Sequence, residues 1–201
     1  MPSINDVAKS LKDRIWFTRI ARINSEKRLL SNELHSQLLL MFYSVYSIVL
    51  SVTQLKYKPI SDDAASVIGT ILSVTLFGLA FHLNARGFAA RAQRFKENYT
   101  LLQVLSGKIE LAECQSNTAT LEATIESVQA KYAEAIVGCE NHTSIDDRCS
   151  RFPYDQKKLS RPLVGWDFLS IFAYRIGRFL GLALLYIFPV AIYSYLLCKM
   201  S

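Results

Sequence analysis

The sequence predicts an all-α membrane protein, in which a helical hairpin crosses the bilayer and long cytoplasmic helices form a coiled-coil-like body. Hydrophobic residues make up 51% of the 201 residues and charged residues 20%, so apolar and charged side chains must be segregated along the chain. Residues 36–55, 64–85 and 179–198 contain no Asp, Glu, Lys or Arg. A helix of about 20 residues rises roughly 30 Å, the thickness of the hydrocarbon core of a bilayer.

Residues 1–35 are predicted to form a cytoplasmic basic amphipathic helix. Its apolar residues recur at near-helical spacing beside a basic face; they are Ile15, Ile20, Ile23, Leu30 and Leu34. Such a helix lies on an anionic membrane surface or packs on the other cytoplasmic helices, and both interpretations stay open. The first apolar run begins too late for a signal peptide, so we expect the first span to act as its own anchor.

Residues 36–85 are predicted as the transmembrane hairpin, with both of its ends in the cytoplasm. The connecting loop, residues 56–63, is short, and its two lysines are matched by Asp62 and Asp63. Basic residues are instead concentrated outside the hairpin, at Lys9, Lys12, Arg14, Arg19, Arg22, Lys27, Arg28, Arg86, Arg91, Arg94 and Lys96. An excess of Lys and Arg in short flanks marks the cytoplasmic side of a span.

Residues 179–198 are predicted as a probable third membrane segment. Pro189 interrupts this stretch, and its tyrosines, Tyr186, Tyr193 and Tyr195, could alternatively hold it near the membrane interface. If it spans, the C-terminus lies outside. The preceding residues, 141–178, contain several turn formers and are predicted as a linker followed by a juxtamembrane helix.

Residues 86–140 are predicted as a cytoplasmic helical hairpin with a break at residues 115–118. Leu121, Ile125, Val128 and Tyr132 repeat at steps of four, three and four, which is typical of a coiled-coil seam. The seam either packs within the hairpin or binds a partner protein, so we treat these four residues as a candidate partner seam.

Small and polar side chains form one face of each hairpin span. On the first span they are Gln37, Ser44, Ser47, Ser51 and Gln54, and on the second they are Ala65, Gly69 and Ser73. Such residues let membrane helices approach closely and bond to one another, or they line a pore. His82, one turn from the cytoplasmic end of the second span, is a further candidate, although it could simply contact interfacial water.

The sequence indicates no catalytic, cofactor-binding or metal site. Cys139, His142 and Cys149 lie close together but lack a fourth zinc ligand at a standard spacing. No triad, dyad or Gly-rich phosphate loop is present, so the sequence predicts no enzyme. The net charge of +6 and the pI near 9.2 would permit phosphate contacts, but no nucleic-acid-binding motif accompanies them, and we expect no direct nucleic-acid partner.

Three features together resemble a known family. They are the basic helix at residues 15–29 (IWFTRIARINSEKRL), the two spans joined by a tight loop, and the helical tail that starts at residues 84–88 (NARGF). Over roughly residues 10–140 the chain resembles the SLATT proteins, two-transmembrane effectors associated with SMODS and SLOG modules. The third apolar stretch departs from the two-span pattern.

The resemblance implies a membrane-permeabilising toxin of bacterial anti-phage defence, located in the inner membrane and silent until a sensing partner is triggered. The implied sensor is genomically linked, either a nucleotide-second-messenger synthase or a retron reverse transcriptase with its msDNA. The implied partners of the spans are membrane lipid and further copies of the chain, whose oligomer would place Ser44, Ser47 and Ser51 around an axis.

A second hypothesis is a membrane-anchored scaffold or regulatory subunit that recruits a soluble partner through its cytoplasmic helices. A lipid-modifying enzyme is disfavoured, because no paired carboxylates or metal ligands fall at membrane depth.

Overall fold

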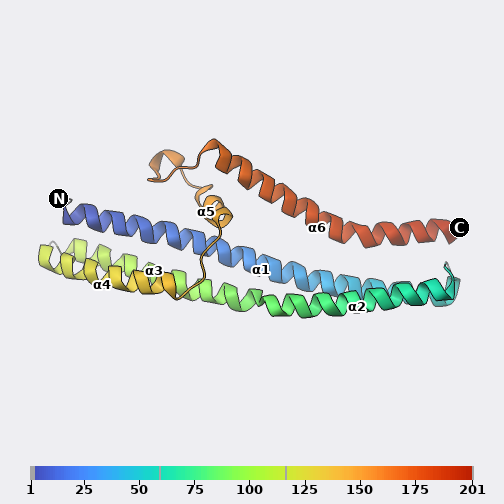
Figure 1. Ribbon diagram of the computed structural model, residues 1–201. Helices are drawn as coiled ribbons and strands as arrows, with labels where there is room; N and C mark the ends of the chain where they lie inside the picture. The colour runs from blue at the N-terminus through green and yellow to red at the C-terminus, as the bar shows by residue number, and fades with distance from the viewer. Residues whose placement is uncertain (1–2, 59, 116, 201) are drawn as a thin grey trace. The chain divides into compact units, whose positions relative to one another are not determined.

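The computed structural model describes residues 3–58, 60–115 and 117–200, and every regular element in these ranges is helical. The prediction of an all-α fold is therefore confirmed. The elements, shown in Figure 1, are α1 (Ile4–Tyr57), α2 (Asp62–Arg86), α3 (Phe88–Cys114), α4 (Thr118–Val137), α5 (Ser144–Arg151), the 3-10 helix η1 (Gln156–Lys158) and α6 (Gly165–Met200).

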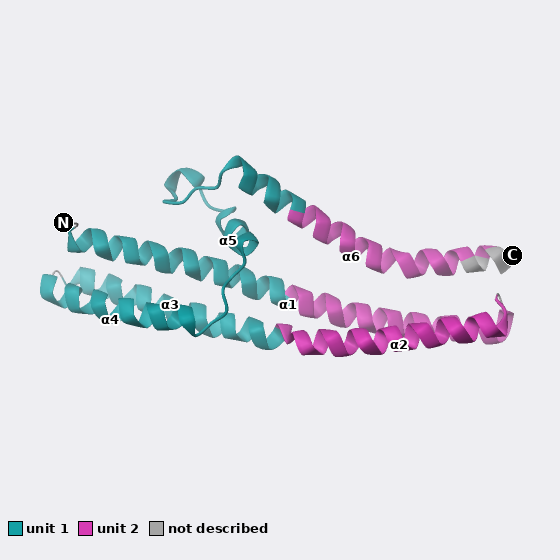
Figure 2. Cartoon of the chain, viewed as in Figure 1, with its two compact units in different colours: residues 1–30, 89–173 teal, residues 31–88, 174–201 magenta. Residues whose placement is uncertain are grey.

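The chain forms two compact units, which Figure 2 distinguishes by colour. Unit 1 consists of Met1–Leu30 and Ala89–Ala173, and unit 2 consists of Ser31–Phe88 and Tyr174–Ser201. Helices α1 and α6 each contribute residues to both units.

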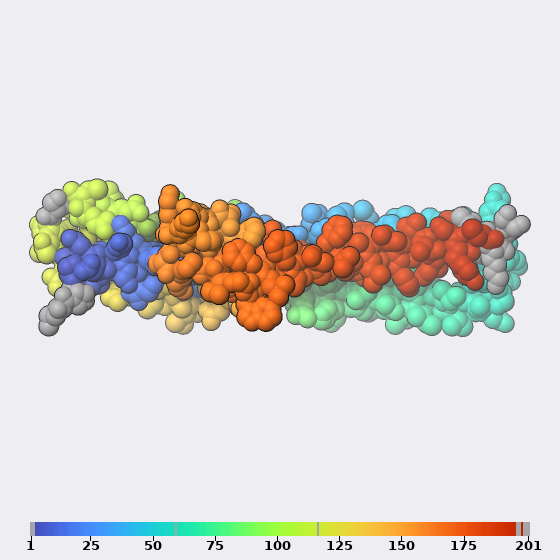
Figure 3. Space-filling view, turned by 90° about the horizontal axis from the view of Figure 1, so that it is seen from above, coloured from blue at the N-terminus to red at the C-terminus, as the bar shows by residue number. Residues whose placement is uncertain are grey.

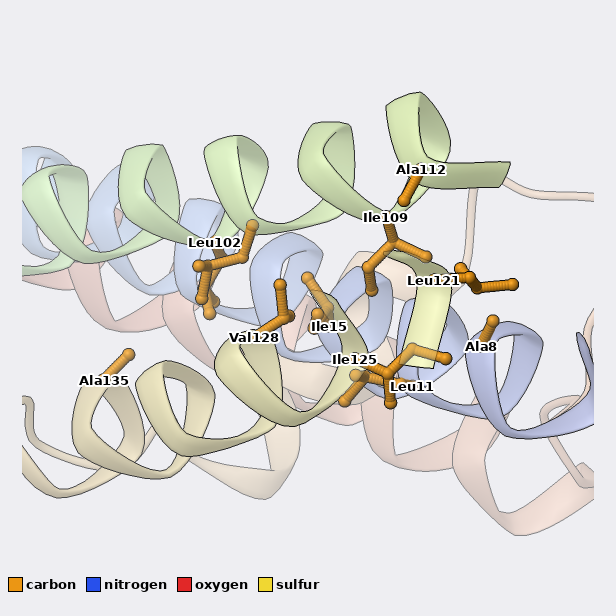
Figure 4. Packing of buried hydrophobic residues seen from close by; sticks show 11 residues of the cluster. Ala8, Leu11, Ile15, Leu102, Ile109, Ala112, Leu121, Ile125, Val128 and Ala135 are labelled. Atoms are coloured by element: carbon orange, nitrogen blue, oxygen red, sulfur yellow. The ribbon is translucent and has the colours of Figure 1, made fainter. Parts of the chain in front are cut away.

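Unit 1 is built around a hydrophobic core to which three helices contribute. The core side chains of α1, α3 and α4 point toward one another in Figure 4; they are Ala8, Leu11, Ile15, Leu102, Leu105, Ile109, Ala112, Leu121, Ile125, Val128 and Ala135. Their steps of three and four residues keep one stripe of each helix turned inward, as in a coiled coil. Burial of each large aliphatic side chain stabilises the unit by about 1.5–3 kcal/mol.

The predicted linker contains a helix that the sequence pattern did not reveal. Helix α5 begins with a capping box, in which Thr143 accepts from the backbone N–H of Asp146 while the Asp146 carboxylate accepts from the backbone N–H of Thr143. Its second half carries Arg148 and Arg151, which favour a helix C-terminus electrostatically. Turn-forming residues around this short helix concealed it, because eight residues give too few periods for a hydrophobic pattern.

Unit 2 consists of parts of α1 and α6 with the whole of α2. In the described ranges, three helical stretches are long and apolar enough to cross a membrane: Ile4–Tyr57, Asp62–Cys114 and Gly165–Tyr195. In their most apolar windows only 6%, 0% and 6% of the residues are buried, so the apolar side chains point outward. Large apolar surfaces of this kind indicate contact with hydrocarbon rather than water.

The three helices of unit 2 lie beside one another. The space-filling view shows the unit 2 part of α6, in red, running over α1 and α2 (Figure 3). Helix α2 starts at an N-cap, Ser61, and ends at Gly87, whose φ of 55° is left-handed. Glycine adopts this conformation without the steric cost that a Cβ would add, so it ends α2 immediately before α3 begins.

Candidate functional site

Helices α1, α2 and α6 surround a cavity of about 650 Å³ in unit 2. Most of the side chains around it are apolar, but hydroxyl and amide groups also contribute. Among the lining residues are Tyr43, Tyr46, Ser47, Ser51 and Gln54 from α1, Ala65, Gly69 and Thr75 from α2, and Phe188, Pro189 and Tyr193 from α6. Ser51 and Gly69 are exposed as well, so the cavity opens to the outside of the unit.

The structure brings together part of the predicted site. Ser47, Ser51 and Gln54 line this cavity from one side, and Ala65 and Gly69 line it from α2. A Cβ built on Gly69 would meet no heavy atom within 4 Å. Gly69 is therefore not required for a close approach of helices within one chain, and its lack of a side chain instead leaves the cavity wider.

The other predicted residues lie away from the cavity. Ser44 and Ser73 are exposed and donate to the carbonyl oxygens four residues earlier, at 2.7 and 2.8 Å. Gln37 is exposed and donates to Glu33 at 2.6 Å. His82, also exposed, accepts from Arg86 at 3.2 Å, which keeps it beside a cation at the end of α2.

Two buried polar atoms of cavity-lining residues have no hydrogen-bond partner within the described part of the chain. They are the Tyr46 hydroxyl oxygen and the Gln54 Oε1. The Gln54 amide nitrogen, in contrast, donates to the Ile60 carbonyl at 2.8 Å. An unpaired polar group in hydrocarbon costs several kcal/mol, so these two positions favour water or another polar group nearby.

Helix α6 is held against α1 by hydrogen bonds along its length. Arg178 donates to Ser31 at 2.8 Å, and the Tyr43 hydroxyl donates to the Leu185 carbonyl at 3.0 Å. The Tyr186 hydroxyl lies 3.4 Å from His35 Nδ1, and the Tyr193 hydroxyl lies 3.3 Å from Thr53 Oγ1. Two of the tyrosines expected at a membrane interface thus bond to α1, whereas Tyr195 is exposed.

Unit 1 contains a buried charge cluster that the sequence analysis missed. The Asp146 carboxylate, 1% exposed, accepts from Arg28 Nε at 2.8 Å, Arg28 Nη2 at 2.9 Å, Ser25 at 2.8 Å and Thr143 at 2.7 Å. Burial alone would raise the pKa of this carboxyl, but these hydrogen bonds outweigh burial and hold the pKa below its usual value. The cluster fastens α5 to α1.

Arg22 and Arg28 are not the surface charges that the flank pattern predicted. Arg22 is fully buried and donates to the Ala135 carbonyl at 3.2 Å, while its Nε has no partner in the described residues. Burial lowers the pKa of its guanidinium. Spacing could not show this, because Arg22 and Arg28 look like any other basic residue of the flank until α4 and α5 pack over them. Lys9, Arg14 and Lys27 stay exposed.

The candidate partner seam is used inside the chain in this structure. Leu121, Ile125 and Val128 are buried in the core of unit 1. The Tyr132 hydroxyl lies 2.9 Å from Thr18 Oγ1 of α1. A protein that bound this seam would first have to displace the helices that already cover it.

Cys139, His142 and Cys149 do not form part of a metal-binding group. Across the described ranges, no three His, Cys, Asp or Glu side chains gather so that they could hold a metal ion. Cys139 is a free thiol that contacts the Arg94 carbonyl at 3.9 Å, and burial raises its pKa. Burial lowers the pKa of His142, so its ring stays neutral at neutral pH.

These features define a helical membrane protein with a largely apolar cavity among its candidate spans, to which hydroxyl and amide groups also contribute, and a separate charged helical unit. A family model described as SMODS and SLOG-associating 2TM effector domain family 5 matches residues 4–196, so the chain belongs to this SLATT family. Membership makes it a membrane effector domain of anti-phage defence, and the family is not a known enzyme class. No curated protein and no solved structure matches significantly.

Proposed function

We propose that the protein permeabilises the bacterial inner membrane as a pore-forming effector of anti-phage defence. The observation that supports this function is the cavity of about 650 Å³, which part of the polar face of α1 lines together with Ala65 and Gly69 of α2. Hydroxyl and amide groups among membrane helices are costly unless they bond to one another or to water. Ser47, Ser51 and Gln54 would line the path of water and ions.

Several copies of the chain would be needed for a continuous pore. The cavity of one chain is bounded by three helices, and none of the described residues of α2 is buried. Ser44 and Ser73, which are exposed and do not line the cavity, carry hydroxyl groups that would suit a neighbouring copy in hydrocarbon. The proposed partners are therefore further copies and membrane lipid.

In the proposed orientation the N-terminus lies in the cytoplasm. The protein is proposed to stay silent until a sensor acts. Lys9, Arg14 and Lys27 remain exposed on α1, so the basic flank survives the loss of Arg22 and Arg28 from the surface. The sensor would be a genomically linked protein, either a nucleotide-second-messenger synthase or a retron reverse transcriptase with its msDNA. Its binding surface would lie on the cytoplasmic helices, without direct contact between this chain and nucleic acid.

Permeabilisation is tested by expressing the chain with its genomic neighbours and following a potential-sensitive dye. Ser51→Leu places a branched apolar side chain at the cavity and is expected to slow depolarisation. Thr70→Leu is the matched control: like Ser51, Thr70 is exposed and donates to the carbonyl oxygen four residues earlier, but it does not line the cavity. Equal effects of both substitutions at matched protein levels, or no depolarisation by the triggered wild type, would contradict the proposal.

A further inference from the structure

Pro189 leaves one backbone carbonyl of α6 without its helical partner. Proline has no backbone N–H, so the carbonyl of Leu185, four residues earlier, cannot receive the usual helix hydrogen bond. The helix bends within its unit 2 part, as Figure 1 and Figure 2 show, and a proline inside a helix is a common cause of a bend. In hydrocarbon no water satisfies a carbonyl freed in this way, so another protein group must do so.

Tyr43 of α1 supplies that group. Its hydroxyl donates to the Leu185 carbonyl at 3.0 Å. The other hydrogen bonds between α1 and α6 in the described part of unit 2 join side chains, as for Arg178 with Ser31 and Tyr193 with Thr53. The Tyr43 bond differs from them because it pairs a backbone oxygen that has lost its own partner, which makes its removal more costly.

The same contact lies at the edge of the cavity. Tyr43 and Pro189 both line it, and with Phe188 and Tyr193 the proline makes α6 the third wall. Without α6, the cavity-facing residues Ser47, Ser51 and Gly69 would lie in an open groove between α1 and α2. The position of α6 therefore determines whether Ser47, Ser51 and Gly69 are covered within the chain.

We propose that α6 is a detachable helix that covers the groove of α1 and α2 containing Ser47, Ser51 and Gln54 in the resting protein, and that the bond from Tyr43 to Leu185 holds it there. Release of α6 leaves the groove free for the hairpin of a second copy. The consequence for leakage rests on the proposed function, whereas the docking of α6 does not.

Tyr46 provides a matched control on the same helix. It lies one turn from Tyr43 and also lines the cavity, but its buried hydroxyl has no partner among the described residues. Tyr43→Phe and Tyr46→Phe each remove one phenolic oxygen from the cavity wall. Only the first removes the partner of Leu185.

The docking of α6 is measured by chemical cross-linking of the full chain in lipid vesicles. Cysteines replace Thr53 and Tyr193, whose hydroxyls lie 3.3 Å apart, in a background in which the native cysteines are serine. Tyr43→Phe is expected to lower the ratio of cross-linkable to free α6 about tenfold, the change that corresponds to about 1.4 kcal/mol for one acceptor left unpaired in hydrocarbon. Tyr46→Phe should leave the ratio unchanged.

A double-mutant cycle with Pro189→Ala tests whether the unpaired Leu185 carbonyl is the reason for the loss of cross-linking in Tyr43→Phe. Alanine restores the N–H that bonds to Leu185 within α6, so Tyr43→Phe should have little effect on cross-linking in that background. The test remains possible if Tyr43→Phe alone does not accumulate. The chain with both substitutions retains the bond from the alanine N–H at position 189 to the Leu185 carbonyl, so it can be compared with Pro189→Ala. An equal loss of cross-linking with and without Pro189→Ala, or no loss in Tyr43→Phe, would overturn the inference.

Dye leakage from the same vesicles separates this inference from the proposed function. Faster leakage of Tyr43→Phe together with reduced cross-linking supports both. Cross-linking that follows the cycle without leakage in any variant would leave the docking of α6 intact and remove pore formation. If the wild type leaks but cross-linking does not change in Tyr43→Phe, pore formation is retained and the proposed docking of α6 through Tyr43 is wrong.

Discussion

At the residue scale, the buried Asp146 carboxylate stabilises unit 1 by accepting hydrogen bonds from Arg28, Ser25 and Thr143. Asp146→Asn removes the charge that pairs with Arg28, whose side chain is only 20% exposed. Removing one partner of a largely buried ion pair is strongly destabilising, so we expect a loss of about 3 kcal/mol in the free energy of unfolding of unit 1. Both tryptophans of the chain, Trp16 and Trp166, belong to unit 1, so urea unfolding in detergent followed by tryptophan fluorescence reports on this unit.

Glu113→Gln is the control for this substitution. Glu113 pairs with Lys12 at 2.7 Å, but the two side chains are 32% and 30% exposed. A pair exposed to that degree contributes less than about 1 kcal/mol. Similar losses for Asp146→Asn and Glu113→Gln would contradict the assignment of Asp146 as the anchor of α5.

Acidification is expected to destabilise unit 1 in two ranges of pH. The pKa of Asp146 is lowered in the folded state, so its contribution is complete above the ordinary carboxyl pKa of about 4 and is lost as the pH falls through the folded pKa. Burial lowers the pKa of His142, so protonation favours unfolding once the pH falls below about 6.5. Unfolding midpoints measured between neutral and acidic pH check the contributions of Asp146 and His142.

Substitutions assign each range to its residue. His142→Gln should remove the decline that begins near neutral pH, and Asp146→Asn should flatten the decline at low pH. A midpoint that rises on acidification would show that the sign is wrong. The sequence contained the residues of this cluster, and the Thr143-x-x-Asp146 spacing is a capping-box signal. The pairing of Asp146 with Arg28 depends on the fold and could not be predicted from spacing alone.

At the element scale, two glycines, one directly before α3 and one inside it, should respond to alanine in opposite directions. Gly87 has a φ of 55°, and a Cβ there would meet nothing within 4 Å, so Gly87→Ala should cost about 1 kcal/mol through backbone strain alone. Gly107, inside α3 and equally free of contacts, has no such φ, so Gly107→Ala should stabilise by about 0.5–1 kcal/mol. Thermal unfolding followed by circular dichroism measures both, and the same sign for both would contradict the local geometry.

The long helices could be predicted from hydrophobic periodicity, whereas α5 could not. The hydrophobic steps along α4 identified the seam of Leu121, Ile125 and Val128 because one face of a long helix repeats many times. Those steps do not say what covers the seam, and in the structure α1 and α3 contribute to the same core. Short elements such as α5 depend on capping and tertiary contacts, which a periodicity does not record.

At the scale of the whole molecule, the sequence predicted which residues share a helical face but not which of them share a cavity. Ser47 and Ser51 line the cavity, while Ser44 on the same predicted face does not. The difference depends on α6, whose bend and hydrogen bonds to α1 determine which part of that face is covered. A contact between segments so far apart in sequence leaves no periodic signal in either of them.

The proposed function depends most on residues 36–55 and 64–85 crossing the inner membrane, with the short loop between them on the periplasmic side. The most direct test labels Lys58→Cys and the native Cys114 with a membrane-impermeant thiol reagent, with the remaining cysteines replaced by serine. Both positions are exposed; Lys58 lies four residues before the start of α2, and Cys114 is the last residue of α3. We predict that position 58 reacts in intact spheroplasts and that Cys114 reacts only after the membrane is opened; equal labelling of both from one side would contradict the account.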